Sequence, residues 1–167
     1  AMRSNPNLQM HTRIRKGNPF RSLTYNVDKF PFQDVVVRRA VAKAIDRDGL
    51  AWITGFGEYQ PKGDFLAANT RYYTPDFKDV LAYDVSEANR LLDSAGWQQR
   101  DGEGYRVKDG QRLAARLATY ESGAYPSSVA VAIQADLKKV GFELTIDMLP
   151  LAQLTERRYA GNFQLLG

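Results

Sequence analysis

Residues 113–149 read LAARLATYESGAYPSSVAVAIQADLKKVGFELTIDML, and this stretch decides the fold class. Apolar and polar residues alternate over 113–120, which predicts a strand. A serine-capped helix is expected over 127–140, and Gly141 is expected to end it. A second alternating strand follows over 142–149. Strand, helix and strand in about 37 residues predict a βαβ unit with parallel strands, and therefore an α/β fold.

The sequence before this unit predicts two further helices. Asp34 can cap a helix over residues 35–48, which we expect to continue past a kink near Gly49 and to end at Gly55. A second helix is expected over residues 84–95, where Asp84 and Glu87 form a capping-box pattern. Gly96 then provides the stop, and Trp97 is expected to pack into the core.

Shorter elements complete the predicted mixed sheet and its flanking helices. Residues 105–107 and 113–120 are expected to form a hairpin through Asp109-Gly110, because both residues accept the positive φ of a two-residue turn. The other predicted elements are strands over 8–14, 20–27 and 163–166 and a short helix over 151–159. Residues 55–82 are expected to form a long ordered loop.

Composition excludes several classes of chemistry. The 167 residues contain no cysteine and a single histidine, His11, so thiolate chemistry and Cys or His-rich metal sites are excluded. We interpret His11 as a surface residue on a strand. No apolar run approaches the roughly 18 residues of a membrane span, and no signal peptide is recognisable. We expect native localisation signals to lie outside this chain, and the chain to be cut from a longer protein.

Catalysis and nucleic-acid binding are not favoured. The net charge is +4, and five positive charges precede the first acid, Asp28. These charges alternate with apolar residues and lack an accompanying aromatic stacking pattern, so they indicate a solvated strand face and no nucleic acid. The acidic residues form no catalytic pair, and residues 101–104 are too short for a calcium loop. The serines lack a nucleophile elbow.

Binding features are stronger than catalytic ones. Residues 120–126 join the carboxyl end of a predicted strand to the start of a helix, where ligands commonly sit in α/β sheets. This loop offers Tyr120, Glu121, Ser122 and Tyr125. The turn at Leu151 is expected to share the same edge. A plain connecting loop remains an equally good reading of these residues.

Several segments resemble, in order, the family-5 extracellular solute-binding proteins of peptide and nickel ABC importers. Each segment is weak alone, but the ordered set covers nearly everything from residue 20 to residue 167. The matching segments are Tyr25-Asn26-Val27, Pro31-Phe32-Gln33-Asp34, Val37-Arg38-Arg39-Ala40, Ala44-Ile45-Asp46-Arg47, Tyr83-Asp84, Leu91-Leu92, Ala95-Gly96-Trp97, Lys108-Asp109-Gly110, Ile133-Gln134-Ala135-Asp136-Leu137 and Gly161-Asn162-Phe163.

This resemblance implies a periplasmic-binding-protein-like type II lobe. Residues 1–27 would connect into the lobe, and 28–167 would form an incomplete second lobe facing an inter-lobe cleft. The loop at 120–126 and the turn at Leu151 would face that cleft, although Leu151 stands where some relatives place a Trp. No histidine lies on these loops, so a direct nickel ligand is not expected here.

The resemblance also implies the partners. We expect an oligopeptide or similar small solute, ABC permease subunits in the full-length protein, no cofactor, and no enzyme activity. Periplasmic or extracellular placement at the cell surface would depend on an N-terminal anchor outside this chain. Two alternatives stay open: the same receptor module in a signalling or transcription-regulatory protein, and an enzyme of unknown type.

Overall fold

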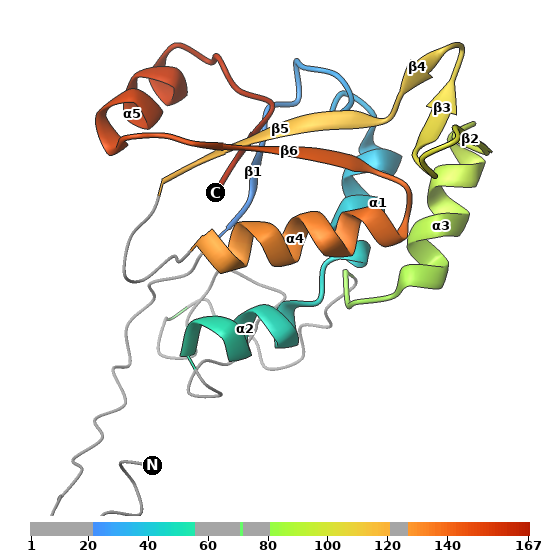
Figure 1. Ribbon diagram of the computed structural model, residues 1–167, viewed down its shortest axis with the longest axis horizontal. Coiled ribbons are helices and arrows are strands. Elements are labelled where there is room, and N and C mark those ends of the chain that lie inside the picture. Colours follow the sequence, from blue (N-terminus) through green and yellow to red (C-terminus); the bar gives the residue numbers. More distant parts are fainter. Residues whose placement is uncertain (1–21, 56–70, 72–80, 121–126) are drawn as a thin grey trace, which may run out of the picture. The chain divides into compact units, whose positions relative to one another are not determined.

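The computed structural model describes residues 22–55, 71, 81–120 and 127–167. Apart from Arg71, these residues all fall in one compact unit, and the fold is that of this unit (Figure 1). Its helices are α1 (Val35–Ala44), α2 (Arg47–Gly55), α3 (Val85–Ser94), α4 (Ser127–Lys139) and α5 (Leu151–Tyr159). Its strands are β1 (Thr24–Tyr25), β2 (Gln99–Arg100), β3 (Arg106–Lys108), β4 (Gln111–Arg112), β5 (Ala114–Thr119), β6 (Glu143–Met148) and β7 (Leu165–Leu166).

The main sheet is mixed, as the sequence predicts. Its strand order is β1-β7-β5-β6. Strands β5 and β6 run parallel with α4 between them in the chain, which confirms the βαβ unit. Strand β7 lies on the other side of β5 and is also parallel to it, whereas β1 pairs with β7 in the antiparallel direction.

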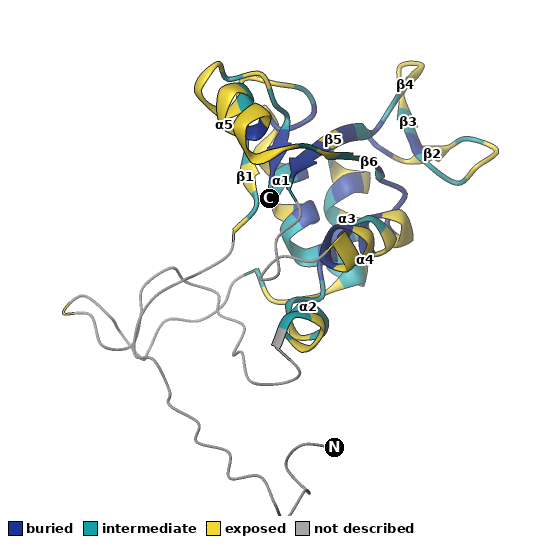
Figure 2. Cartoon of the chain, turned by 60° about the vertical axis from the view of Figure 1, so that its left-hand side comes forward, coloured by how far each residue is buried: buried dark blue, intermediate teal, exposed yellow. Residues whose placement is uncertain are grey.

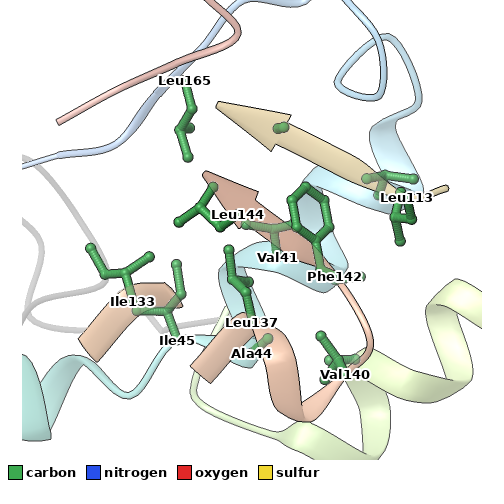
Figure 3. Packing of buried hydrophobic residues seen from close by; sticks show 14 of the residues in the cluster. Val41, Ala44, Ile45, Leu113, Ile133, Leu137, Val140, Phe142, Leu144 and Leu165 are labelled. Atoms are coloured by element: carbon green, nitrogen blue, oxygen red, sulfur yellow. The ribbon is translucent and has the colours of Figure 1, made fainter. Parts of the chain in front are cut away.

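One face of this sheet carries the core. Alternate side chains of β5 and the start of β6 pack with α1 and α4 in one cluster, in which Leu117 is completely buried. Leu137 and Phe142, also completely buried, lie in the same cluster (Figure 3). Each such side chain contributes roughly 1.5–3 kcal/mol of transfer free energy. The period-2 pattern over 113–120 therefore identifies the buried face, because Leu113, Ala115, Leu117 and Thr119 are all buried.

The predicted helix over 35–48 is wrong in its continuity. Asp34 caps α1 as expected, because its carboxylate accepts from the N–H of Val36, but α1 ends at Ala44. A new helix, α2, begins two residues after Ile45, and Asp46 accepts from the N–H of Gly49 in its first turn. The break thus precedes Gly49, which lies inside α2.

Helix α3 starts and stops as the sequence predicts. Asp84 accepts from the N–H of Glu87, and Gly96 has a φ of +87° after the helix. A hydrogen bond from Arg90 holds the pKa of Glu87 below its ordinary value. Trp97 is buried in the core, as expected.

The predicted hairpin is right in its turn and wrong in its second strand. Asp109 and Gly110 have φ values of 49° and 76°, and they join β3 to the two-residue strand β4 in a small sheet of order β2-β3-β4. At Leu113 the chain passes from the small sheet to the main sheet. The N–H of Leu113 donates to the carbonyl of Arg106 in β3, and its carbonyl accepts from the N–H of Glu143 in β6. Residues 114–119 consequently pair with β6 in the main sheet.

The strand predicted over 20–27 is reduced to β1 within the described residues. Asn26 follows it, and its side-chain amide donates to the carbonyl oxygens of Gly161 and Phe163, both at 3.0 Å. These bonds fix the turn that leads into β7. The strand predicted over 8–14 and most of the loop predicted over 55–82 lie outside the described residues.

Candidate functional site

Three parallel strands end at the same edge of the main sheet. The carboxyl ends of β5 and β6 both point toward α5 and the chain's C-terminus (Figure 1). The N–H of Leu149 donates to the carbonyl of Thr119 at 2.8 Å, and the N–H of Gly167 donates to the carbonyl of Ala118 at 3.1 Å. The buried hydroxyl of Thr119 bonds Gly167 as well. This edge is therefore held together beyond the last residue of each strand.

Helix α5 starts directly at this edge. Pro150 occupies its N-cap position and makes no side-chain capping bond. The first backbone bond of the helix comes from Leu154 to Pro150. Among the described residues, nothing accepts from the N–H groups of residues 151–153, as is usual for the first turn of an uncapped helix. These groups are donors suited to a carboxylate or another anion.

The structure brings two of the five predicted site residues to this edge. Tyr120 is half-buried and packs on a small cluster formed by Ala118, Leu154 and Leu166. Leu151 is 59% exposed, on the mostly solvent-facing helix α5 (Figure 2). The other three, Glu121, Ser122 and Tyr125, lie outside the described residues.

The sheet face that α5 borders is charged. Asp147 on β6 accepts from Arg157 at 3.1 Å and forms an ion pair with Arg116 at 3.3 Å. Both arginines are partly exposed, whereas the carboxylate of Asp147 is mostly covered. This pairing ties α5 to the sheet, and such partly exposed ion pairs contribute up to about 1 kcal/mol each.

The edge combines hydrogen-bond donors with apolar surface. Its described residues, 118–120, 148–154 and 165–167, supply backbone donors and exposed apolar surface from Leu151 and Met148, but no histidine, cysteine or carboxylate. In the whole described part of the chain, no three His, Cys, Asp or Glu side chains lie close enough to hold a metal ion. No described helix is long and apolar enough to span a membrane.

Comparison with known families decides the class of this fold. A family model described as "Bacterial extracellular solute-binding proteins, family 5 Middle" matches residues 1–167. The chain belongs to this family. Its mixed α/β architecture is accordingly that of the periplasmic-binding-protein type II fold, which confirms the predicted fold class.

The relatives of this chain include proteins named for nickel binding and proteins named for oligopeptide binding. The chain is 27% identical over 164 residues to the "Nickel-binding periplasmic protein" of Escherichia coli, with 98% of this chain and 31% of the relative covered. It is 31% identical over 138 residues to the "Oligopeptide-binding protein AppA" of Bacillus subtilis, with 79% of this chain and 24% of that relative covered. The chain thus spans less than a third of the curated relatives' length.

Solved structures give the same fold. The structure of NikA from Brucella suis in complex with Fe(III)-EDTA superposes with a TM-score of 0.78 at 31% identity, over 86% of this chain and 29% of that one. AppA from Bacillus subtilis in complex with a nonapeptide superposes with a TM-score of 0.79 at 24% identity, over 86% of this chain and 29% of that one. The second likeness shows the fold alone.

Two features of the edge escape sequence reasoning. The sequence predicts donors at the start of the helix after residue 126, whereas the donors that the described structure places at this edge are the N–H groups of residues 151–153 at the start of α5. Pro150 before a helix without a Ser, Thr, Asp or Asn cap is the signal that could have found them. The position of β7 beside β5 has no local signal, because it depends on Asn26 far upstream.

Proposed function

We propose that this chain forms part of the second lobe of the substrate-binding component of an ABC-type importer. Residues 28–167 would make up this incomplete lobe, with 1–27 as the connection into it. The solute would be a peptide or similar small molecule, held in a cleft between this lobe and another. The observation that carries the proposal is the edge itself, where β5, β6 and β7 end beside the first N–H groups of α5, which no described residue accepts from.

The chemistry of this edge favours a solute with a carboxylate and apolar groups. Backbone N–H groups of residues 151–153 can bind the carboxylate, and the exposed side chains of Leu151 and Met148 can cover apolar atoms. We include Tyr120, Glu121, Ser122 and Tyr125 in the same binding surface. Family membership supports a binding role in place of catalytic turnover.

The proposed partners follow from that role. In the full-length protein, solute binding would favour a closed arrangement of two lobes, and the closed form would dock on the permease subunits. The protein would work in the periplasm or outside the cell, attached at the surface by an anchor outside this chain. No nucleic acid and no resident cofactor take part in this scheme.

A thermal-shift screen of the full-length protein tests the proposal. The panel contains short peptides, sugars, and nickel with and without chelators. A ligand at 100 times its Kd stabilises the folded state by about 2.7 kcal/mol, so a peptide of the right class should raise Tm by several degrees. A panel without any stabilising compound, or robust hydrolase or transferase turnover by the same preparation, would overturn the proposal.

A further inference from the structure

The chain contains three Asp-Gly steps: Asp48-Gly49, Asp101-Gly102 and Asp109-Gly110. Such steps can isomerise without an enzyme, because glycine has no side chain to shield its amide nitrogen from the preceding carboxyl group. The reaction needs a carboxyl group that is free to turn back and an amide nitrogen that is free to attack. The three steps differ sharply in both respects.

The step at Asp48 is blocked at the amide. It lies in the first turns of α2, where helical geometry restrains the backbone. The N–H of Gly49 donates to the carboxylate of Asp46 at 3.0 Å. The side chain of Asp46 also crowds the position that a Cβ on Gly49 would occupy. The attacking nitrogen is therefore engaged elsewhere.

The step at Asp101 is blocked at the carboxylate. One oxygen accepts from the N–H groups of Glu103 at 2.9 Å and Tyr105 at 3.0 Å. The other oxygen pairs with Arg112 at 2.6 Å. Desolvation opposes these bonds, but together they hold the pKa of Asp101 below its ordinary value. A carboxylate fixed and ionised in this way is a poor electrophile.

The step at Asp109 carries neither block. Both of its residues are exposed at the tip of the β3–β4 turn. Among the described residues, no group bonds the carboxylate of Asp109 or the N–H of Gly110, and an added Cβ on Gly110 would meet nothing within 4 Å. Positive φ at Asp109 is a conformation that few residues other than Gly, Asn and Asp adopt readily.

We propose that Asp109 is a site of spontaneous backbone isomerisation to isoaspartate. The nitrogen of Gly110 attacks the side-chain carboxyl carbon of Asp109, a C–N bond forms, and the hydroxyl leaves as water with the amide proton. The resulting succinimide is then opened by one water molecule. Attack at the main-chain carbonyl gives isoaspartate, and attack at the side-chain carbonyl restores aspartate. Mass is unchanged overall, and no oxidant or cofactor is required.

The consequence would be local. Isoaspartate adds a methylene to the backbone between the paired residues Lys108 and Gln111. Lys108 donates to the carbonyl of Ala95 at 2.9 Å and lies over the ring of Trp97. Isomerisation should therefore loosen the small sheet and the end of α3. The β3–β4 turn lies at the opposite end of the unit from α5, so the candidate binding edge should be spared (Figure 1).

The test is prolonged incubation of the full-length protein at neutral pH, followed by mapping of isoaspartate. Methyl transfer by an isoaspartyl methyltransferase measures the total, and fragmentation of the chymotryptic peptide 106–113 locates it. We expect several-fold more isoaspartate at Asp109 than at Asp48 or Asp101. Isoaspartate at either of the other two steps in equal or greater amount would overturn the proposal.

Matched variants separate this chemistry from general ageing. Asp109→Glu should remove the isoaspartate signal at this position, because the longer side chain would have to close a six-membered imide in place of the five-membered succinimide. Asp109→Asn should accelerate it, because the same ring then forms with loss of ammonia. Asp48→Glu and Asp101→Glu should leave the signal from Asp109 unchanged. A signal that persists in Asp109→Glu would contradict the assignment.

Discussion

The backbone N–H of Asp46 donates to the carboxylate of Asp136, 3.0 Å away and 90 positions later in the chain. This bond joins the break between α1 and α2 to the last turn of α4. Asp136 is buried, and its second oxygen accepts from Lys139 at 2.7 Å. The same hydrogen bond raises the pKa of Lys139. The carboxylate of Asp136 thus positions the junction between α1 and α2 against α4, the helix of the βαβ unit.

Removal of this carboxylate should destabilise the fold. Asp136→Ala leaves the N–H of Asp46 unpaired, and we expect the free energy of unfolding to fall by about 2 kcal/mol. Lys139→Ala is the matched control, because it keeps the bond to Asp46 and removes a half-exposed ion pair, which contributes at most about 1 kcal/mol. Urea denaturation of the full-length variants measures both. Equal losses would show that the bond to Asp46 contributes nothing.

Substitution of Arg106 should lower the free energy of unfolding more than substitution of Asp136 does. Its buried guanidinium donates to the carbonyls of Val140 and Trp97 and to the side chains of Asn89 and Asp93. We expect Arg106→Met to cost about 3 kcal/mol, because several buried acceptors lose their donor. Arg106→Lys should recover less than half of this loss, because an ammonium group cannot reach all four acceptors. Wild-type stability in Arg106→Lys would refute the role of the fork geometry.

Asn26 offers a test of how β7 is positioned. Asn26→Asp keeps the oxygen that accepts from Asp28 but loses both donors to Gly161 and Phe163. We expect a loss of about 1–3 kcal/mol, and faster hydrogen exchange in β7. Exposed Gln33→Ala serves as the control and should change little. Unaltered exchange in β7 would argue against this role of Asn26.

Tyr25 should make stability depend on alkaline pH. Burial raises the pKa of Tyr25 from 10.0 to about 12, although Arg47 and Arg38 oppose the shift. The unfolded chain therefore loses this proton first, so the stabilisation is complete below pH 10 and is lost as pH rises toward 12. The shift corresponds to roughly 2–3 kcal/mol.

The measurement compares wild type with Tyr25→Phe, which has no proton to lose. The difference in their unfolding free energies should shift in favour of the variant over this pH window. Other alkaline effects are common to both proteins and cancel. A difference that stays constant from pH 9 to pH 12 would show that Tyr25 titrates normally.

Leu151 tests the binding edge. Leu151→Asp places a negative charge beside the donors of α5, where it should compete with a carboxylate ligand. We expect affinity for a peptide ligand of the full-length protein to fall about tenfold or more, an effect of roughly 1.4 kcal/mol. Val131→Asp on α4, at a similar exposure of 54%, should leave affinity unchanged. Equal affinities for both variants would remove Leu151 from the site.

Local patterns predict much of this fold. The βαβ unit, the caps at Asp34 and Asp84, the stop at Gly96 and the bounds of α5 all depend on residues close in the sequence. These features follow from side-chain period, capping and positive φ, which act within a few residues. Such elements could be predicted from the sequence and are confirmed.

The sequence-based predictions are wrong where contacts between residues far apart in the chain determine the secondary structure. The helix predicted over 35–48 breaks after Ala44, and there Asp46 bonds Asp136 across 90 positions. The second strand of the hairpin divides at Leu113, because its two backbone groups pair with different sheets. The split at Leu113 has no local signal, whereas the start of α2 has one in Asp46, whose carboxylate accepts from the N–H of Gly49 three residues later.

The candidate site was predicted in part. The sequence places Tyr120 and Leu151 at one edge, and the structure brings both there. It also buries part of Tyr120 against Leu154, a contact that depends on how α5 folds back on the sheet. The binding role of these two residues, and of Glu121, Ser122 and Tyr125, stays a prediction.

Hydrogen exchange of the full-length protein with and without its stabilising solute shows whether the solute binds at this edge. We expect ligand-dependent protection at residues 149–154 and 166–167, where the strands end beside α5. It predicts no change at residues 106–112 in the small sheet. Protection confined to the small sheet, or absent from the edge while the solute is bound, would contradict the assignment of this edge to solute binding.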